Sequence, residues 1–172
     1  MGHDFKFEVI PLEQVADKPQ VLTENQQPVV LVVDDEPLIV DSLAAILANV
    51  GLTVLKAYDG PSALEVAMSS PPHLLVTDVA MPGMNGIELA MTVARSLPTC
   101  RVLLFSGHAS QLDLTPAREA GFDFPLLSKP IHPREMVSRV FASLQAQPRQ
   151  QRTRRHEAAK NHFQWLAPHV SA

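Results

Sequence analysis

Short apolar runs alternate with stretches of helical spacing along the central part of the chain. The first run, VVLVV, is β-branched, apolar throughout and followed by acids, which is typical of a strand covered on both faces. Pro37 then suits a first helical turn, and apolar residues recur at helical spacing up to Gly51. The pattern repeats, so the predicted strands are 29–33, 52–58, 73–78, 101–106 and 125–129, and the predicted long helices begin near 37, 60, 85 and 133.

This alternation predicts an α/β fold, in which a five-stranded parallel sheet is doubly wound with helices on both faces and right-handed crossovers. The fourth unit is irregular, because Pro116 lies where the fourth helix belongs and cannot donate a hydrogen bond inside it. With Thr115 as the cap and Pro116 in the first position, little more than one turn fits before Gly121. The sequence therefore predicts a short or broken fourth helix.

Two extensions flank the predicted domain, which covers residues 29–146. Residues 1–28 are rich in Pro, Gln, Glu and Asn and are predicted to be mostly flexible, although the segment FKFEV has the period-two spacing of a short strand. Residues 147–172 form a basic tail, and the spacing of their apolar side chains allows one helix. A single helix of that length is marginal in water unless it docks.

The composition favours an intracellular protein with a buried core. Of the 172 residues, 46% are hydrophobic, which is enough for one domain of ordinary size. Cys100 is the only cysteine, so no disulfide framework can form, and the cytoplasm is the expected location. No apolar run approaches the roughly 18 residues that a transmembrane helix needs. We therefore expect no membrane span.

The net charge of −4 is unevenly distributed. Residues 1–28 carry −3, residues 29–147 carry −5 and residues 148–172 carry +4. An acidic body with a small basic tail differs from a nucleic-acid binder, whose basic groups form a broad face. The tail is also too short for the packed helices of a helix-turn-helix unit. From these features we expect no sequence-specific DNA binding.

Polar residues follow four of the predicted strands. Asp34 and Asp35 come after the first strand, and Asp78, Ser106 and Lys129 end the third, fourth and fifth. Because the carboxyl ends of parallel strands form the ligand crevice of such a sheet, we expect these side chains to converge. Packed carboxylates repel one another, and a hard divalent cation with oxygen ligands relieves that repulsion. Mg²⁺ is the expected ion, since it uses few carboxylates alongside waters and phosphate oxygens.

The same residues predict phosphoryl chemistry at Asp78. A cation on one side of Asp78 and Lys129 on the other would neutralise the oxygens of a phosphoryl group while the carboxylate attacks in line. The hydroxyl of Ser106 can donate a hydrogen bond to one of those oxygens. The expected product is an acyl phosphate on Asp78.

Four motifs, VVLVVDDEP, LLVTDVAMPGMNG, LLFSGHA and LLSKPI, resemble the receiver domain of bacterial two-component response regulators, which has a flavodoxin-like fold. The resemblance covers about residues 29–146, and it is specific because the motifs have the family's order and about its spacing. It implies a role for each residue of the site: Asp78 is the phosphoacceptor, Asp34 and Asp35 hold Mg²⁺, Ala80 adds its backbone carbonyl as a metal ligand, Ser106 is the switch hydroxyl and Lys129 pairs with the phosphoryl group.

The chain departs from the family near the end of the sheet. The resemblance implies an aromatic residue three positions before Lys129, whose rotation reports phosphorylation, but Leu126 stands there. Phe124 lies two residues earlier, and a bulge in this segment would realign it. Leu126 and Phe124 are therefore both candidates for the switch position, and together with Pro116 they indicate an atypical output face. The resemblance also implies that the Lys129–Pro130 peptide bond is cis.

As a receiver, the protein is expected to be a single-domain response regulator and not a metabolic enzyme. It would accept a phosphoryl group on Asp78 from a sensor histidine kinase or a phosphotransfer protein, with at most Mg²⁺-dependent self-phosphorylation and autodephosphorylation. It would signal through contacts with a downstream protein, and a weak homodimer is compatible with this reading. Two alternatives stay open: a phosphorelay intermediate that passes the phosphoryl group on, and a scaffold whose partner binding is independent of phosphorylation.

Overall fold

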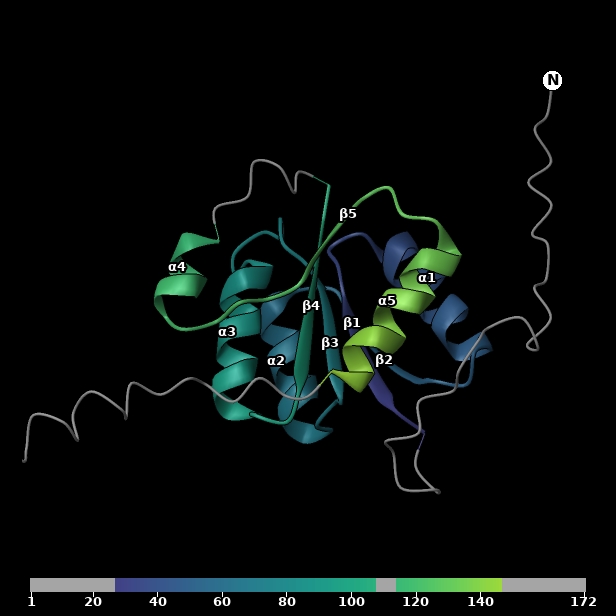
Figure 1. Cartoon of the computed structure of the whole chain (residues 1–172), viewed down its shortest axis with the longest axis horizontal. Coiled ribbons are helices and arrows are strands. Elements are labelled where there is room, and N and C mark those ends of the chain that lie inside the picture. The colour runs from purple at the N-terminus through teal and green to yellow at the C-terminus, as the bar shows by residue number, and fades with distance from the viewer. Residues whose placement is uncertain (1–26, 108–113, 147–172) are drawn as a thin grey trace, which may run out of the picture.

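The computed structural model describes residues 27–107 and 114–146. Strands and helices alternate along this part of the chain (Figure 1). In chain order the elements are β1 (Val29–Val33), α1 (Pro37–Asn49), β2 (Thr53–Ala57), α2 (Gly60–Ser69), β3 (Leu74–Asp78), α3 (Gly86–Ser96), β4 (Arg101–Ser106), α4 (Thr115–Glu119), β5 (Leu126–Ser128) and α5 (Pro133–Gln145). The predicted α/β fold is confirmed, and each predicted strand agrees with the structure to within one residue at either end.

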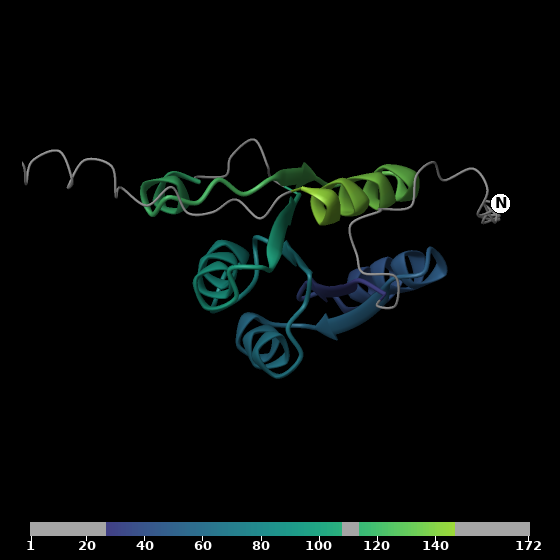
Figure 2. The same ribbon diagram turned by 60° about the horizontal axis from the view of Figure 1, so that its bottom comes forward.

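The strands form one parallel sheet in the order β2-β1-β3-β4-β5. Helices α1 and α5 cover one face and α2 and α3 cover the other, while α4 lies beside α3 (Figures 1 and 2). From β1 the chain first adds β2 on one side and then returns to add β3 on the other, so the direction in which strands are added reverses between β1 and β3. In open α/β sheets, ligands bind at the carboxyl ends of the strands next to such a reversal.

The core has two halves because successive residues of a strand point to opposite faces. In β1, Val30 and Val32 pack under α1 and α5, whereas Leu31 and Val33 pack under α2 and α3. All four are almost completely buried. A strand buried on both faces is typically apolar along most of its length, which is why the run VVLVV predicted β1 correctly.

Local hydrogen bonds fix where three of the helices begin. The Asp59 carboxylate accepts the backbone N–H of Ser62 at the start of α2. Asn85 and Glu88 form a capping box at the start of α3, in which each side chain accepts a backbone N–H of the other residue. His132 accepts the backbone N–H of Arg134 at the start of α5. These caps set the loops that leave the carboxyl ends of the sheet.

Helix α4 has only five residues, as the position of Pro116 predicted. Its start is one residue earlier than expected: Leu114 is the cap, Thr115 the first helical residue and Pro116 the second. The expected role of Thr115 as the cap was therefore wrong, and the apolar cap residue makes no side-chain hydrogen bond to the helix. The peptide bond between Lys129 and Pro130 is cis, as the family resemblance implied.

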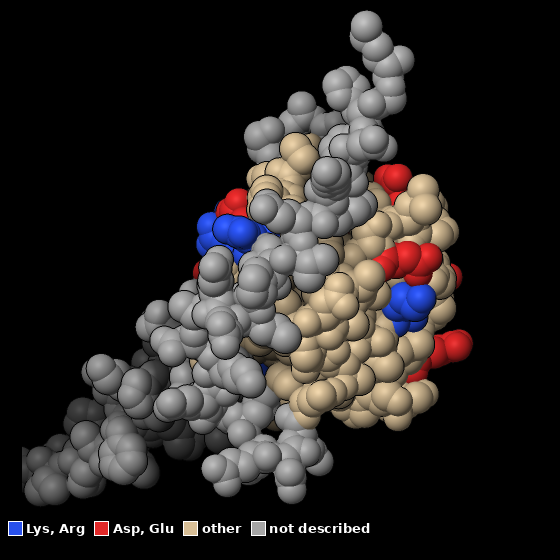
Figure 3. Space-filling model, turned by 90° about the vertical axis from the view of Figure 1, so that its right-hand side faces the viewer, with Lys and Arg blue, Asp and Glu red and all other residues tan. Residues whose placement is uncertain are grey.

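The predictions for the flexible leader (1–28) and the basic tail (147–172) fall almost entirely outside the described residues. Among the residues that the structure does describe, no helix is long and apolar enough to cross a membrane. Charged side chains are sparse and of both signs on the described surface seen in Figure 3. One exposed ion pair joins β2 to α1, with the Lys56 ammonium 2.9 Å from the Asp41 carboxylate.

Candidate phosphorylation and metal site

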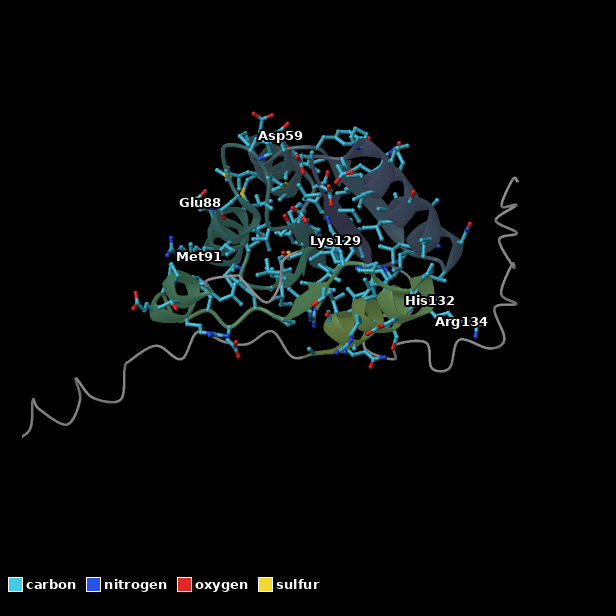
Figure 4. The ribbon with its side chains drawn as sticks, turned by 90° about the horizontal axis from the view of Figure 1, so that it is seen from above. Asp59, Glu88, Met91, Lys129, His132 and Arg134 are labelled. Atoms are coloured by element: carbon cyan, nitrogen blue, oxygen red, sulfur yellow. The ribbon has the colours of Figure 1, made fainter. Side chains whose placement is uncertain are left out.

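The polar residues predicted at the strand ends lie at one edge of the sheet. Asp34 and Asp78 follow or end the neighbouring strands β1 and β3, and their exposed fractions are 1% and 5%. Ser106 ends β4 and is also buried, whereas Asp35 is exposed. Figure 4 looks onto the carboxyl ends of the strands and shows Lys129 near the middle of this edge. The structure thus collects the predicted residues from four strands.

Lys129 joins the two buried carboxylates. Its Nζ lies 2.6 Å from Oδ2 of Asp34 and 2.7 Å from Oδ1 of Asp78. Burial by itself lowers the pKa of Lys129, but the hydrogen bonds and charges of Asp34 and Asp78 outweigh it and raise that pKa above its ordinary value of 10.5. The lysine is therefore a permanent cation held between two anions at physiological pH.

The remaining carboxylate oxygens accept backbone hydrogen bonds from the loops that follow their strands. Oδ1 of Asp34 accepts the N–H of Glu36 at 2.9 Å, and Oδ2 of Asp78 accepts the N–H of Ala80 at 2.7 Å. Each carboxylate is thus fixed at both oxygens, one by the ammonium and one by the backbone. Their orientation is set before any ligand arrives.

Ser106 is tied to Lys129 through the backbone. Its carbonyl accepts the N–H of Lys129 at 2.8 Å, and Ser106 pairs with Ser128 in the ladder between β4 and β5. Ser106 and Lys129 therefore lie at the ends of neighbouring strands that are joined by backbone hydrogen bonds.

The donor set suits a hard divalent cation. Asp34 and Asp78 are close enough to share one ammonium, and the loop after Asp78 brings the backbone of Ala80 beside it. Over residues 27–107 and 114–146, however, no three His, Cys, Asp or Glu side chains are grouped to hold a metal by themselves. Asp35 is exposed, and Lys129 occupies the position between Asp34 and Asp78. A metal at this site would share Asp34 with Lys129.

Gly86 contributes to the site in a way that the sequence analysis missed. A Cβ atom at this residue would lie 1.9 Å from the carbonyl oxygen of Asp78 and 3.0 Å from Oγ1 of Thr77. The Thr77 hydroxyl in turn donates a hydrogen bond to the same carbonyl at 2.9 Å. The first residue of α3 therefore packs directly on the backbone of the predicted phosphoacceptor. The signal in the sequence was the glycine that closes the motif AMPGMNG.

The ladder of β5 with β4 contains no bulge of the kind that would realign Phe124. The ladder runs without a break from Leu104 and Leu126 to Ser106 and Ser128, so Leu126 keeps the position three residues before Lys129. Phe124 lies before the strand, where its ring stacks on that of Phe122 with centroids 5.3 Å apart. Of the two candidate switch residues, Leu126 thus lies in β5 and Phe124 lies before it.

The strand order and the carboxylates at its reversal place the chain among doubly wound α/β domains of the flavodoxin-like type. The family described as response regulator receiver domain matches residues 30–141, and the chain belongs to that family. Receiver domains are phosphoacceptor switches and generally bind Mg²⁺ at the phosphorylation site.

Among its relatives is the alkaline phosphatase synthesis transcriptional regulatory protein PhoP of Bacillus subtilis, with 36% identity over 115 residues, 67% of this chain and 48% of PhoP. The DNA-binding response regulator MtrA of Mycolicibacterium smegmatis is 32% identical over 115 residues, 67% of this chain and 50% of MtrA. A solved CheY-like receiver domain protein from Methanospirillum hungatei has a TM-score of 0.64 and 27% identity, covering 69% of this chain and 94% of that one.

The chain spans about half the length of these two curated relatives. Their names describe transcriptional or DNA-binding regulators, so the expectation that sequence-specific DNA binding is excluded was wrong. That expectation rested on the acidic charge of residues 29–147 and on the shortness of the tail. Neither feature separates a receiver domain of a DNA-binding regulator from one that acts alone.

Proposed function

We propose that Asp78 accepts a phosphoryl group from the phosphohistidine of a sensor kinase, and that the phosphorylated receiver then acts through protein contacts. The observation that carries this proposal is the pair of short contacts from Lys129 to Asp34 and Asp78. A buried carboxylate held beside a fixed ammonium is suited to receive a group whose own oxygens are negatively charged.

In the transfer, an oxygen of the Asp78 carboxylate attacks the phosphorus in line, the bond from phosphorus to the donor imidazole nitrogen breaks, and an acyl phosphate forms. Lys129 stays beside Asp78 and pairs with an oxygen of the incoming group. The Ser106 hydroxyl, at the next strand end, would donate to another of these oxygens. Both residues hold positions set by the sheet, so little reorganisation accompanies the reaction.

Mg²⁺ would be held by Asp34, Asp35, Asp78 and the backbone carbonyl of Ala80. When bound, it supplies positive charge that offsets the phosphoryl oxygens and the clustered carboxylates. Asp34 is then shared between two cations, since its Oδ2 already contacts Lys129. Asp35, exposed at the mouth of the site, is free to turn toward the ion without breaking a buried contact.

The test is phosphorylation of the purified chain by acetyl phosphate and Mg²⁺, followed by intact-mass measurement. The wild-type protein should gain the mass of one phosphoryl group, which hydroxylamine removes, whereas Asp78→Asn should gain none. Asp41→Asn is the matched control, because Asp41 is an exposed carboxylate of α1 that pairs with Lys56. Equal labelling of Asp78→Asn and wild type would overturn the assignment.

A further inference from the structure

Phe105 lies between the strands that carry Asp78 and Lys129. In the sheet it is the ladder partner of Asp78 on β3 and of Leu127 on β5. Paired positions of parallel strands point to the same face, and Lys129 follows Leu127 by two residues, so all four side chains share one face. Phe105 is 5% exposed and belongs to the half of the core under α1 and α5.

The Lys129 ammonium lies against the face of the Phe105 ring. Nζ of Lys129 lies over the ring, 4.8 Å from its centroid. An aromatic face attracts a cation within about 6 Å, and the attraction is stronger when the cation is removed from water. The Lys129 side chain is 19% exposed, so much of its surface is withdrawn from solvent. Among the described residues, the ammonium contacts two carboxylates and lies over one ring.

The ring differs from the two carboxylates in one respect. Asp34 and Asp78 are both needed elsewhere during phosphoryl transfer, the first for metal binding and the second for bond formation. The face of Phe105 is a contact that neither event uses. It can keep the ammonium in place while the two ion pairs are rearranged.

We infer that Phe105 is a positioning residue for phosphoryl transfer, which holds the Lys129 ammonium over its ring face beside Asp78. This inference rests on the proposed function of Asp78. A purely structural role for Phe105 would require only an apolar side chain of similar volume. The two roles separate when the charge distribution of the ring is changed while its shape is kept.

The experiment replaces Phe105 with phenylalanines of increasing fluorination, which weakens and then reverses the negative potential of the ring face at nearly constant shape. The first readout is the ammonium signal of Lys129 in NMR spectra of the metal-free protein, identified by its loss in Lys129→Arg. The wild-type signal should be displaced upfield by the ring and should move downfield as fluorination increases. Phe105→Leu should abolish the displacement.

The second readout is the rate of phosphorylation by acetyl phosphate at saturating Mg²⁺. Strong fluorination of Phe105, and Phe105→Leu, should slow it by about 3- to 10-fold, as expected for loss of one partly desolvated cation–π contact. Fluorination of Phe122 is the matched control: this ring is buried, lies under Arg95 and should leave the rate unchanged. Thermal unfolding of each variant shows whether the core remains intact.

The outcomes are distinguishable. An unchanged rate and an unchanged Lys129 signal across the Phe105 series, in a wild-type protein that is phosphorylated on Asp78, would overturn the inference and leave the proposed function standing. A wild-type protein that takes no phosphoryl group on Asp78 would overturn the proposed function and, with it, the role of Phe105 in transfer.

Discussion

Asp34 and Asp78 are two carboxylates in nearly dry positions, and Lys129 is the cation that makes their proximity tolerable. Buried charges cost several kcal/mol each in lost hydration, and that cost is offset only when each charge is paired and hydrogen bonded. Here every oxygen of both carboxylates has a partner, either the ammonium or a backbone N–H. A carboxylate oxygen can contact more than one partner, so a metal ion would share Asp34 with Lys129.

Lys129→Met should therefore destabilise the metal-free protein by roughly 3 kcal/mol at pH 7, because it leaves two buried carboxylates unpaired. Because the folded-state pKa of Lys129 is raised above 10.5, its contribution is complete below that pH and is lost as pH rises through the folded value. Wild type should thus lose stability above pH 10.5 that the variant does not lose. Urea unfolding as a function of pH measures both effects.

The control for this substitution is Lys56→Met, which removes a lysine from an exposed ion pair and should change the stability little. A Lys129→Met protein as stable as wild type at pH 7 would contradict the picture of an ammonium that neutralises buried acids.

The loops after β1 and β3, together with the start of α3, determine how these side chains are presented. Gly86, the first residue of α3, lies so close to Asp78 that no side chain fits between them. The strands and helices could be predicted because each has its own periodic pattern of apolar residues. The contact between Gly86 and Asp78 joins two different elements, so it produces no periodic pattern in the sequence. Gly86 could be seen in the motif AMPGMNG, but the sequence did not show why a glycine is required there.

Gly86→Ala should force α3 away from β3 and lower the stability by about 2 kcal/mol, with a matching loss of Asp78 phosphorylation. Gly107→Ala is the control for stability, since a Cβ there meets no atom within 4 Å. Denaturant unfolding and the acetyl phosphate assay measure the two effects. The proposed packing is wrong if Gly86→Ala is as stable and as readily phosphorylated as the wild type.

The same limit explains the end of the sheet. Pro116 predicted the short α4 because the effect of a proline on a helix is local. The cap could not be predicted, because it is Leu114, whose apolar side chain makes no capping hydrogen bond. Leu126 and Phe124 could not be separated by sequence, because the choice depends on the register of β5 against β4. The ladder places Leu126 in β5 and leaves Phe124 before the strand, and the switch role of either residue stays a prediction.

For the molecule as a whole, the parallel order of the sheet brings together residues that are far apart in the chain, and Lys129 and Asp34 are 95 positions apart. The strand-end rule predicted this convergence from sequence alone, since it depends only on where each strand stops. It could not predict that Lys129 would bridge the acids, nor that Phe105 would lie beneath it. The sequence was least informative about how the domain passes its signal on, and the exclusion of DNA binding was wrong.

Mg²⁺ should stabilise the folded chain, because the unfolded chain has no assembled site. We expect the melting temperature to rise with Mg²⁺ concentration and to return to its starting value when EDTA is added. Asp34→Asn should show a much smaller rise, and Asp41→Asn should behave like the wild type. Equal rises in all three proteins would place the ion elsewhere.

Whether Asp78 carries the phosphoryl group can be established by chemical mapping of the modified residue. Borohydride reduces an aspartyl phosphate to homoserine, which mass spectrometry of the peptides then locates. After incubation with a phosphodonor and Mg²⁺, we predict homoserine at position 78 alone. Homoserine at Asp34 or Asp35, or at no position in a protein that has gained a phosphoryl group, would contradict the account.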